Sequence, residues 1–103
     1  MNNRLDALLN LYTKDPNDPF LLYGIALEYM SAKNYSEAEK YFKTLLQQDP
    51  EYVPAYMQFA RLKENQNEVD GAKNLYLQGI KVAKETGDYH AAKEMEEFLD
   101  ELE

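Results

Sequence analysis

The chain of 103 residues contains no cysteine and no tryptophan, and it has only one histidine. The lack of cysteine excludes disulfides, thiolate metal ligands and cysteine nucleophiles. No apolar run approaches the roughly 18 residues that a membrane-spanning helix needs, and Asp6 falls where a signal peptide would be apolar. We therefore expect a cytoplasmic protein that does not use the membrane as a partner.

Basic residues are also scarce, and the charge is unevenly distributed. There are 11 Lys and Arg against 19 Asp and Glu, for a formal net charge of −8. The last ten positions carry six of the acids and none of the bases. A nucleic-acid backbone or an anionic lipid surface would be repelled by this balance, so we expect no nucleic acid and no membrane among the partners.

An internal repeat is the strongest feature of the sequence. Asp15-Pro16 recurs 34 residues later as Asp49-Pro50. A period of 34 residues accommodates two helices of about 13 residues and two short turns. The same offset relates residues of similar size: Leu22 and Tyr56, Ile25 and Phe59, Ala26 and Ala60, Ala38 and Ala72, and Phe42 and Tyr76.

Helix start and stop signals agree with this period. They predict six helices over residues 2–13, 19–32, 36–48, 54–66, 70–85 and 88–102, and no strand. Expected N-caps are Asp18, Ser36 (in a capping box with Glu39), Asp70 and Asp88. Left-handed turn residues are expected at Asn34 and Asn67. Gly79 lies inside a predicted helix, where we expect a close approach to the last helix.

The pattern Leu22-x2-Ile25-Ala26-x2-Tyr29, followed by Ala38-x3-Phe42 and then Pro50, resembles the tetratricopeptide repeat, in a small protein of bacterial type. The second copy is looser, with Lys63 in place of Tyr29 and Lys84 in place of Pro50. The resemblance implies an all-α fold, a right-handed superhelical array of antiparallel helix hairpins with about 2.5 units. A single domain would then comprise a half repeat (1–16), two repeats (19–52 and 53–86) and a closing helix with an acidic end (88–103).

No catalytic or metal-binding pattern stands out. His90 and Glu94 lie one helical turn apart, but a zinc site needs at least three protein ligands. Glycine-rich phosphate loops and nucleophile elbows are absent from the sequence. We therefore predict that the protein is not an enzyme and uses no metal and no cofactor.

Recognition of another protein is better supported. The helix predicted over 19–32 has a second apolar row in addition to its packing positions, so it is apolar nearly all round. An uncovered row of this kind marks an interaction site. The resemblance places the first helix of each repeat in a concave groove that binds extended peptides or helices. The predicted groove residues are Phe20, Tyr23, Leu27 and Met30 in the first repeat and Met57, Gln58, Arg61 and Glu64 in the second.

The predicted function is thus a protein–protein interaction module that binds an apolar peptide or helix of a partner, with Arg61 fixing its register. Three alternatives stay open. The apolar row could be buried by the chain itself, and Arg61 could pair with Glu64 or Glu28. The chain could also self-associate as a homodimer, through the same apolar row or through the C-terminal helix. That helix could pack on the fifth helix or dock in a neighbour's groove.

Overall fold

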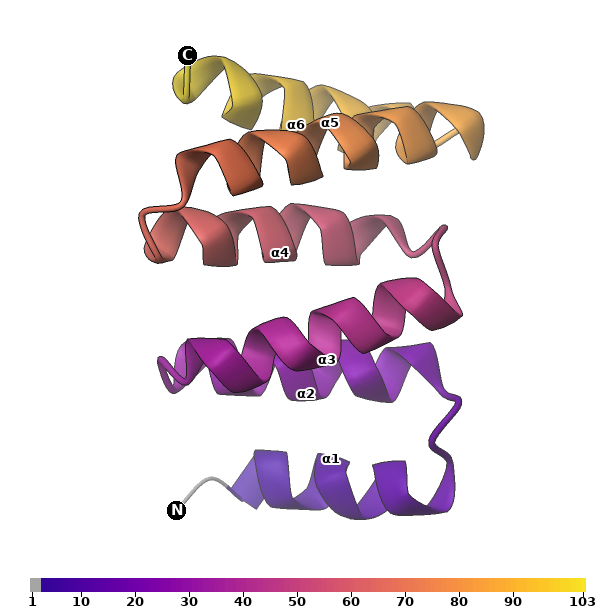
Figure 1. Cartoon of the computed structure of the whole chain (residues 1–103). Helices are drawn as coiled ribbons and strands as arrows, with labels where there is room; N and C mark the ends of the chain where they lie inside the picture. The colour runs from indigo at the N-terminus through magenta and orange to yellow at the C-terminus, as the bar shows by residue number, and fades with distance from the viewer. Residues whose placement is uncertain (1–2) are drawn as a thin grey trace. The chain divides into compact units, whose positions relative to one another are not determined.

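A computed structural model describes residues 3–103, which form six α-helices and no strand (Figure 1). The helices are α1 (Asn3–Lys14), α2 (Pro19–Ser31), α3 (Tyr35–Gln48), α4 (Val53–Asn65), α5 (Val69–Glu85) and α6 (Tyr89–Glu101). The all-α array of helix hairpins predicted from the repeat is confirmed. The chain divides into two compact units, one ending at Pro50 and the other running from Glu51 to Glu103.

In the first unit, α2 and α3 form an antiparallel hairpin and α1 packs against α2 (Figure 1). The hairpin core is fully buried at Leu22, Ile25 and Phe42, and the small residues Ala26 and Ala38 are buried with it. These are the packing positions that the repeat pattern predicted. Small side chains there let the two helices approach closely.

In the second unit, α5 packs against both α4 and α6. Its 17 residues make it longer than the 14-residue α3, as expected where Lys84 replaces the helix-ending Pro50. A Cβ atom built at Gly79 would lie only 2.7 Å from Cβ of Tyr56 on α4 and 2.6 Å from Sδ of Met95 on α6. The expected close approach at Gly79 is therefore confirmed, and it involves α4 as well as α6.

One turn type joins three pairs of helices. The amide groups of Asn34, Glu68 and Asp88 donate to the carbonyls of residues five positions earlier, as in a Schellman motif. The residue before each of these has positive φ: Lys33 (62°), Asn67 (60°) and Gly87 (82°). The prediction for Asn67 is correct. The prediction for Asn34 is wrong, because Lys33 takes the left-handed conformation and Asn34 has φ −90°.

This turn also explains why two predicted N-caps are wrong. In each of the three turns the residue after the left-handed one is the N-cap, so Asn34 and Glu68 take this position, and α3 and α5 begin one residue earlier than expected. Ser36 and Asp70 consequently lie inside the first turn of these helices and do not cap them. The caps at the other two sites are confirmed: Asp18 accepts a hydrogen bond from the Phe20 amide, and Asp88 accepts one from the Ala91 amide.

Candidate functional site

The first predicted row lies on α2, whose start is set by Asp18 and by Pro19 in its first turn. Five residues of α2 are buried, all between Leu21 and Ala26. Phe20, which begins the second row, is 65% exposed. The other members of this row, Tyr23, Leu27 and Met30, are half-buried. This row is therefore covered only in part, and least at the N-terminal end of the helix.

The α2 row is also nearly free of charge. Glu28 is the only charged residue of α2. Its carboxylate is 2.8 Å from Nε of Arg4 on α1, which places the ion pair between these two helices. An apolar row with aromatic rings and no charge of its own favours an apolar ligand over a strongly charged one.

The second predicted row lies on α4, in the second unit. Met57, Gln58 and Glu64 are half-buried, and Arg61 is exposed. Neither of the two expected partners of Arg61 binds it among the described residues: Glu28 pairs with Arg4, and Glu64 accepts a hydrogen bond from the Tyr76 hydroxyl at 2.5 Å. The Arg61 guanidinium instead lies over the ring of Phe98, 5.5 Å from its centroid.

Sequence reasoning missed that Phe98 and Tyr76 contact two residues of the α4 row, Arg61 and Glu64. Their rings stack with centroids 5.8 Å apart, so α5 and α6 together fix the side chains of Arg61 and Glu64. Burial raises the pKa of the Tyr76 phenol above its ordinary value, and its hydrogen bond to Glu64 raises it further. The only signal in the sequence was that Phe98 lies beside the packing face of the last helix.

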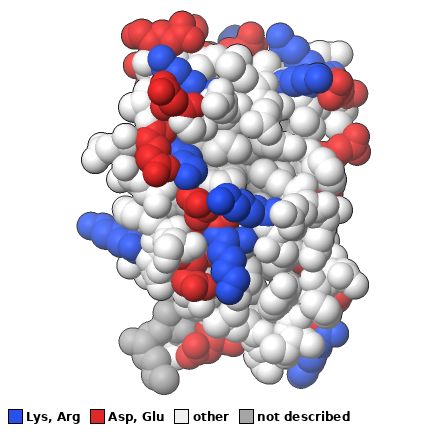
Figure 2. Space-filling model, in the orientation of Figure 1, with Lys and Arg blue, Asp and Glu red and all other residues white. Residues whose placement is uncertain are grey.

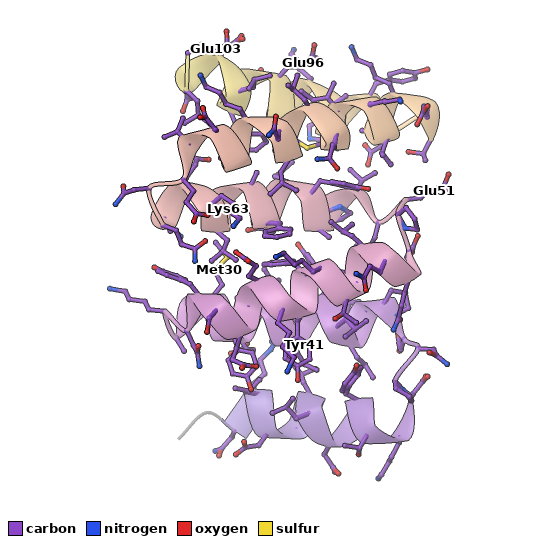
Figure 3. All side chains as sticks on the ribbon, viewed as in Figure 1. Met30, Tyr41, Glu51, Lys63, Glu96 and Glu103 are labelled. Carbon is purple, nitrogen blue, oxygen red and sulfur yellow. The ribbon has the colours of Figure 1, made fainter. Side chains whose placement is uncertain are left out.

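A second aromatic cluster lies in the first unit. Tyr41 points from α3 toward α1 (Figure 3), where its ring meets Tyr12 edge-on at 6.0 Å. Tyr29 of α2 stacks on the same ring at 5.7 Å. Burial raises the pKa of the Tyr41 phenol, and the neighbouring Tyr29 adds to this effect. The three rings connect all three helices of the unit, which is a packing role.

Two other sequence expectations concern metal binding and the membrane. Nε2 of His90 lies 3.3 Å from a Glu94 carboxylate oxygen; the His90 side chain is largely in solvent, and the Glu94 side chain is about half exposed. Within residues 3–103, no group of three or more histidine, aspartate or glutamate side chains is placed to hold a metal ion. None of the helices formed by the described residues has both the length and the apolar character needed to cross a bilayer.

The repeated turns, the 34-residue period and the α2–α3 and α4–α5 hairpins define a helical-repeat protein. Residues 29–95, more than half of the chain, match the family model described as tetratricopeptide repeat. The chain belongs to the tetratricopeptide repeat family.

Known proteins similar to this chain are of the same kind. A TPR repeat-containing protein of Pseudomonas aeruginosa is 25% identical over 99 residues, which cover 96% of this chain and 94% of that protein. The solution structure of a tetratricopeptide repeat domain protein from Salinibacter ruber is 36% identical, with a TM-score of 0.82 and coverage of 86% of this chain and 90% of that one. The Yersinia enterocolitica type III secretion chaperone SycD, solved with a peptide of the translocator YopD, has the same fold at 12% identity, with a TM-score of 0.85 and coverage of 95% and 76%.

Proposed function

We propose that this protein is an interaction module, not an enzyme, and that it binds an apolar peptide or helix of a partner protein. The observation that carries the proposal is the exposed Phe20 at the head of an uncharged row on α2. Peptide binding by SycD, which shares the fold, supports the same class of function.

The α2 row provides the apolar anchors in this proposal. Phe20 and Tyr23 offer rigid rings, and Leu27 and Met30 extend the same face at helical spacing. Such anchors need little reorganisation, because each is already half-covered or held by the helix backbone, so the entropic cost of binding is small.

The α4 row supplies adaptable and polar contacts. Met57 is a flexible apolar side chain that accommodates irregular ligands. Arg61 is held over Phe98 and forms no ion pair with any described residue, so its guanidinium can donate to a backbone carbonyl or a carboxylate of the bound chain. In this role Arg61 sets the register of the ligand, and Gln58 and Glu64 flank it.

The test starts from a displayed library of random peptides selected on the wild-type protein. Affinities of the selected peptides are then measured by calorimetry. We expect Phe20→Ser to weaken binding about tenfold or more, because an aromatic anchor contributes on the order of 1–2 kcal/mol or more. Leu77→Ser is the matched control, since Leu77 is 55% exposed but lies on α5.

Equal affinity of the wild type and Phe20→Ser for every selected peptide would refute the α2 row as the binding surface. The same row could instead pair two copies of the chain. In that case the wild type would be a dimer by light scattering, and Phe20→Ser would make it monomeric without any peptide being involved.

A further inference from the structure

One face of α1 is left uncovered. α1 has no buried residue, and Leu11 is 49% exposed, whereas Leu45, its equivalent one repeat later, is fully buried. Leu8 is the residue that packs onto α2, where its side chain approaches Gly24. The uncovered face consists of exposed residues spaced by three or four: Arg4, Ala7, Leu11 and Lys14.

The outer side of α6 is the corresponding feature of the second unit. The buried residues Ala91, Ala92 and Met95 match the buried residues of α4 at an offset of 36 positions. In this register, Tyr89 corresponds to Val53 and Glu96 to Ala60. Val53 is buried, but Tyr89 is 68% exposed. Glu96 is also exposed, although its carboxylate lies 3.7 Å from Nζ of Lys84 on α5.

The two exposed faces are complementary when the internal hairpins are used as a template. Within each hairpin, the paired alanines lie six residues on either side of the C-cap, as Ala26 and Ala38 do around Ala32. α1 is equivalent to the second helix of such a hairpin, and α6 is equivalent to the first. The same antiparallel register between two copies places Glu96 opposite Arg4 of the other copy. These two positions hold alanines in the hairpins, so the longer side chains of Arg4 and Glu96 set a wider spacing between the two helices. Seven residues toward the start of α6 and seven toward the end of α1, this register places Tyr89 within one helical turn of Leu11 of the other copy.

We propose that the uncovered face of α1 binds the outer face of α6 of a second copy of this chain. Leu11 packs against Tyr89 in this contact, and Arg4 pairs with Glu96. Arg4 uses Nε for Glu28, so its terminal amino groups are available for a second carboxylate. Glu96 is half-exposed, and its partner within the chain, Lys84, is 3.7 Å away.

This contact differs from pairing through the α2 row in its symmetry. It joins two different surfaces, so two copies joined by one contact keep one free α6 face on one copy and one free α1 face on the other. Association through such a contact continues into a chain of copies or closes into a ring. The contact depends on opposite charges, so it weakens with added salt. Acidic side chains also gather where α6 ends (Figure 2).

The association is weak because a single helix pair buries much less than a standard interface. We expect a dissociation constant on the order of 0.1–1 mM in low salt. Sedimentation velocity of the full chain should show an average mass that rises steadily above 12.0 kDa with concentration. The average mass should return to the monomer value in about 0.5 M salt, where charges are screened over a few ångströms.

Charge reversal makes the test specific. Arg4→Glu or Glu96→Arg alone should weaken self-association about three- to tenfold, and an equimolar mixture of the two variants should restore it, since each again meets an opposite charge. Glu28→Gln controls for loss of the Arg4–Glu28 pair and should associate like the wild type. Tyr89→Ser should weaken association, whereas Leu77→Ser should not.

A wild-type chain that stays monomeric at about 2 mM in low salt would overturn the proposal, since this exceeds the expected dissociation constant. A mixture of the two charge variants that does not recover association would also overturn it. None of these results bears on peptide binding by α2, because Phe20 takes no part in this contact.

Discussion

Gly79 provides the sharpest test of how the second unit is packed, because local and tertiary effects oppose each other there. Replacing a helical glycine with alanine usually stabilises a helix by about 1 kcal/mol. At Gly79, however, the new methyl group would lie 2.7 Å from Cβ of Tyr56 and 2.6 Å from Sδ of Met95. The Met95 side chain can move, but Cβ of Tyr56 is attached directly to the α4 backbone, so α4 and α5 must separate.

Overpacking of this kind costs about 1–3 kcal/mol. The contacts at Gly79 are shorter than Cβ atoms normally make, so we expect the upper part of this range, about 2–3 kcal/mol. After subtracting about 1 kcal/mol of gained helix propensity, we expect Gly79→Ala to lower the free energy of unfolding by about 1–2 kcal/mol. The melting temperature should fall by at least about 4 °C. Urea unfolding followed by circular dichroism at 222 nm measures the change directly.

Gly71→Ala is the matched control in the same helix. The new methyl group would meet only the side chain of Lys63, at an ordinary contact distance of 3.5 Å. We therefore expect Gly71→Ala to stabilise the protein by about 0.5–1 kcal/mol. If Gly79→Ala were as stable as the wild type or more so, the close approach of the three helices at this position would be refuted.

Two further predictions concern a turn and a phenol. Lys33→Gly should raise the free energy of unfolding by about 1 kcal/mol, because Lys33 has φ 62° and its Cβ is strained there; urea unfolding with no gain would contradict this. The pKa of Tyr76 is raised in the folded state, so the contribution of its neutral phenol is complete below pH ~10, the unfolded value, and is lost as the pH rises above it. Unfolding measured from pH 8 to pH 11 should therefore show stability falling above pH ~10, and Tyr76→Phe should reduce this fall; an unchanged slope in the variant would refute it.

The 34-residue period predicted the hairpins because equivalent positions face equivalent neighbours. Ala26, Ala38, Ala60 and Ala72 are all fully buried, as expected. Helix starts were less predictable, because the residue after the left-handed one, Asn34 or Glu68, is the N-cap even though Ser36 and Asp70 have the side chains that this position prefers. Local preference and turn geometry competed there, and the turn prevailed.

The surroundings of Arg61 could not be predicted from the period. α5 is three residues longer than α3, and the connection that follows it is one residue shorter. Together these changes move the offset to the next helix from 34 to 36 and shift every residue of α6 relative to α4. Phe98 comes under Arg61 only in the shifted register. The exposure of Phe20 and the partial burial of Leu27 likewise depend on which neighbouring side chains reach α2, and a single-helix pattern does not contain this information.

Methyl spectroscopy tests the binding surface most directly. Methionine methyl groups labelled with carbon-13 report on Met30 in the α2 row, on Met57 in the α4 row and on Met95, which is buried. On titration with a selected apolar peptide, we expect the Met30 and Met57 resonances to shift with one common dissociation constant while the Met95 resonance stays in place. A shift confined to Met95, or no shift at Met30 at saturating peptide, would contradict it.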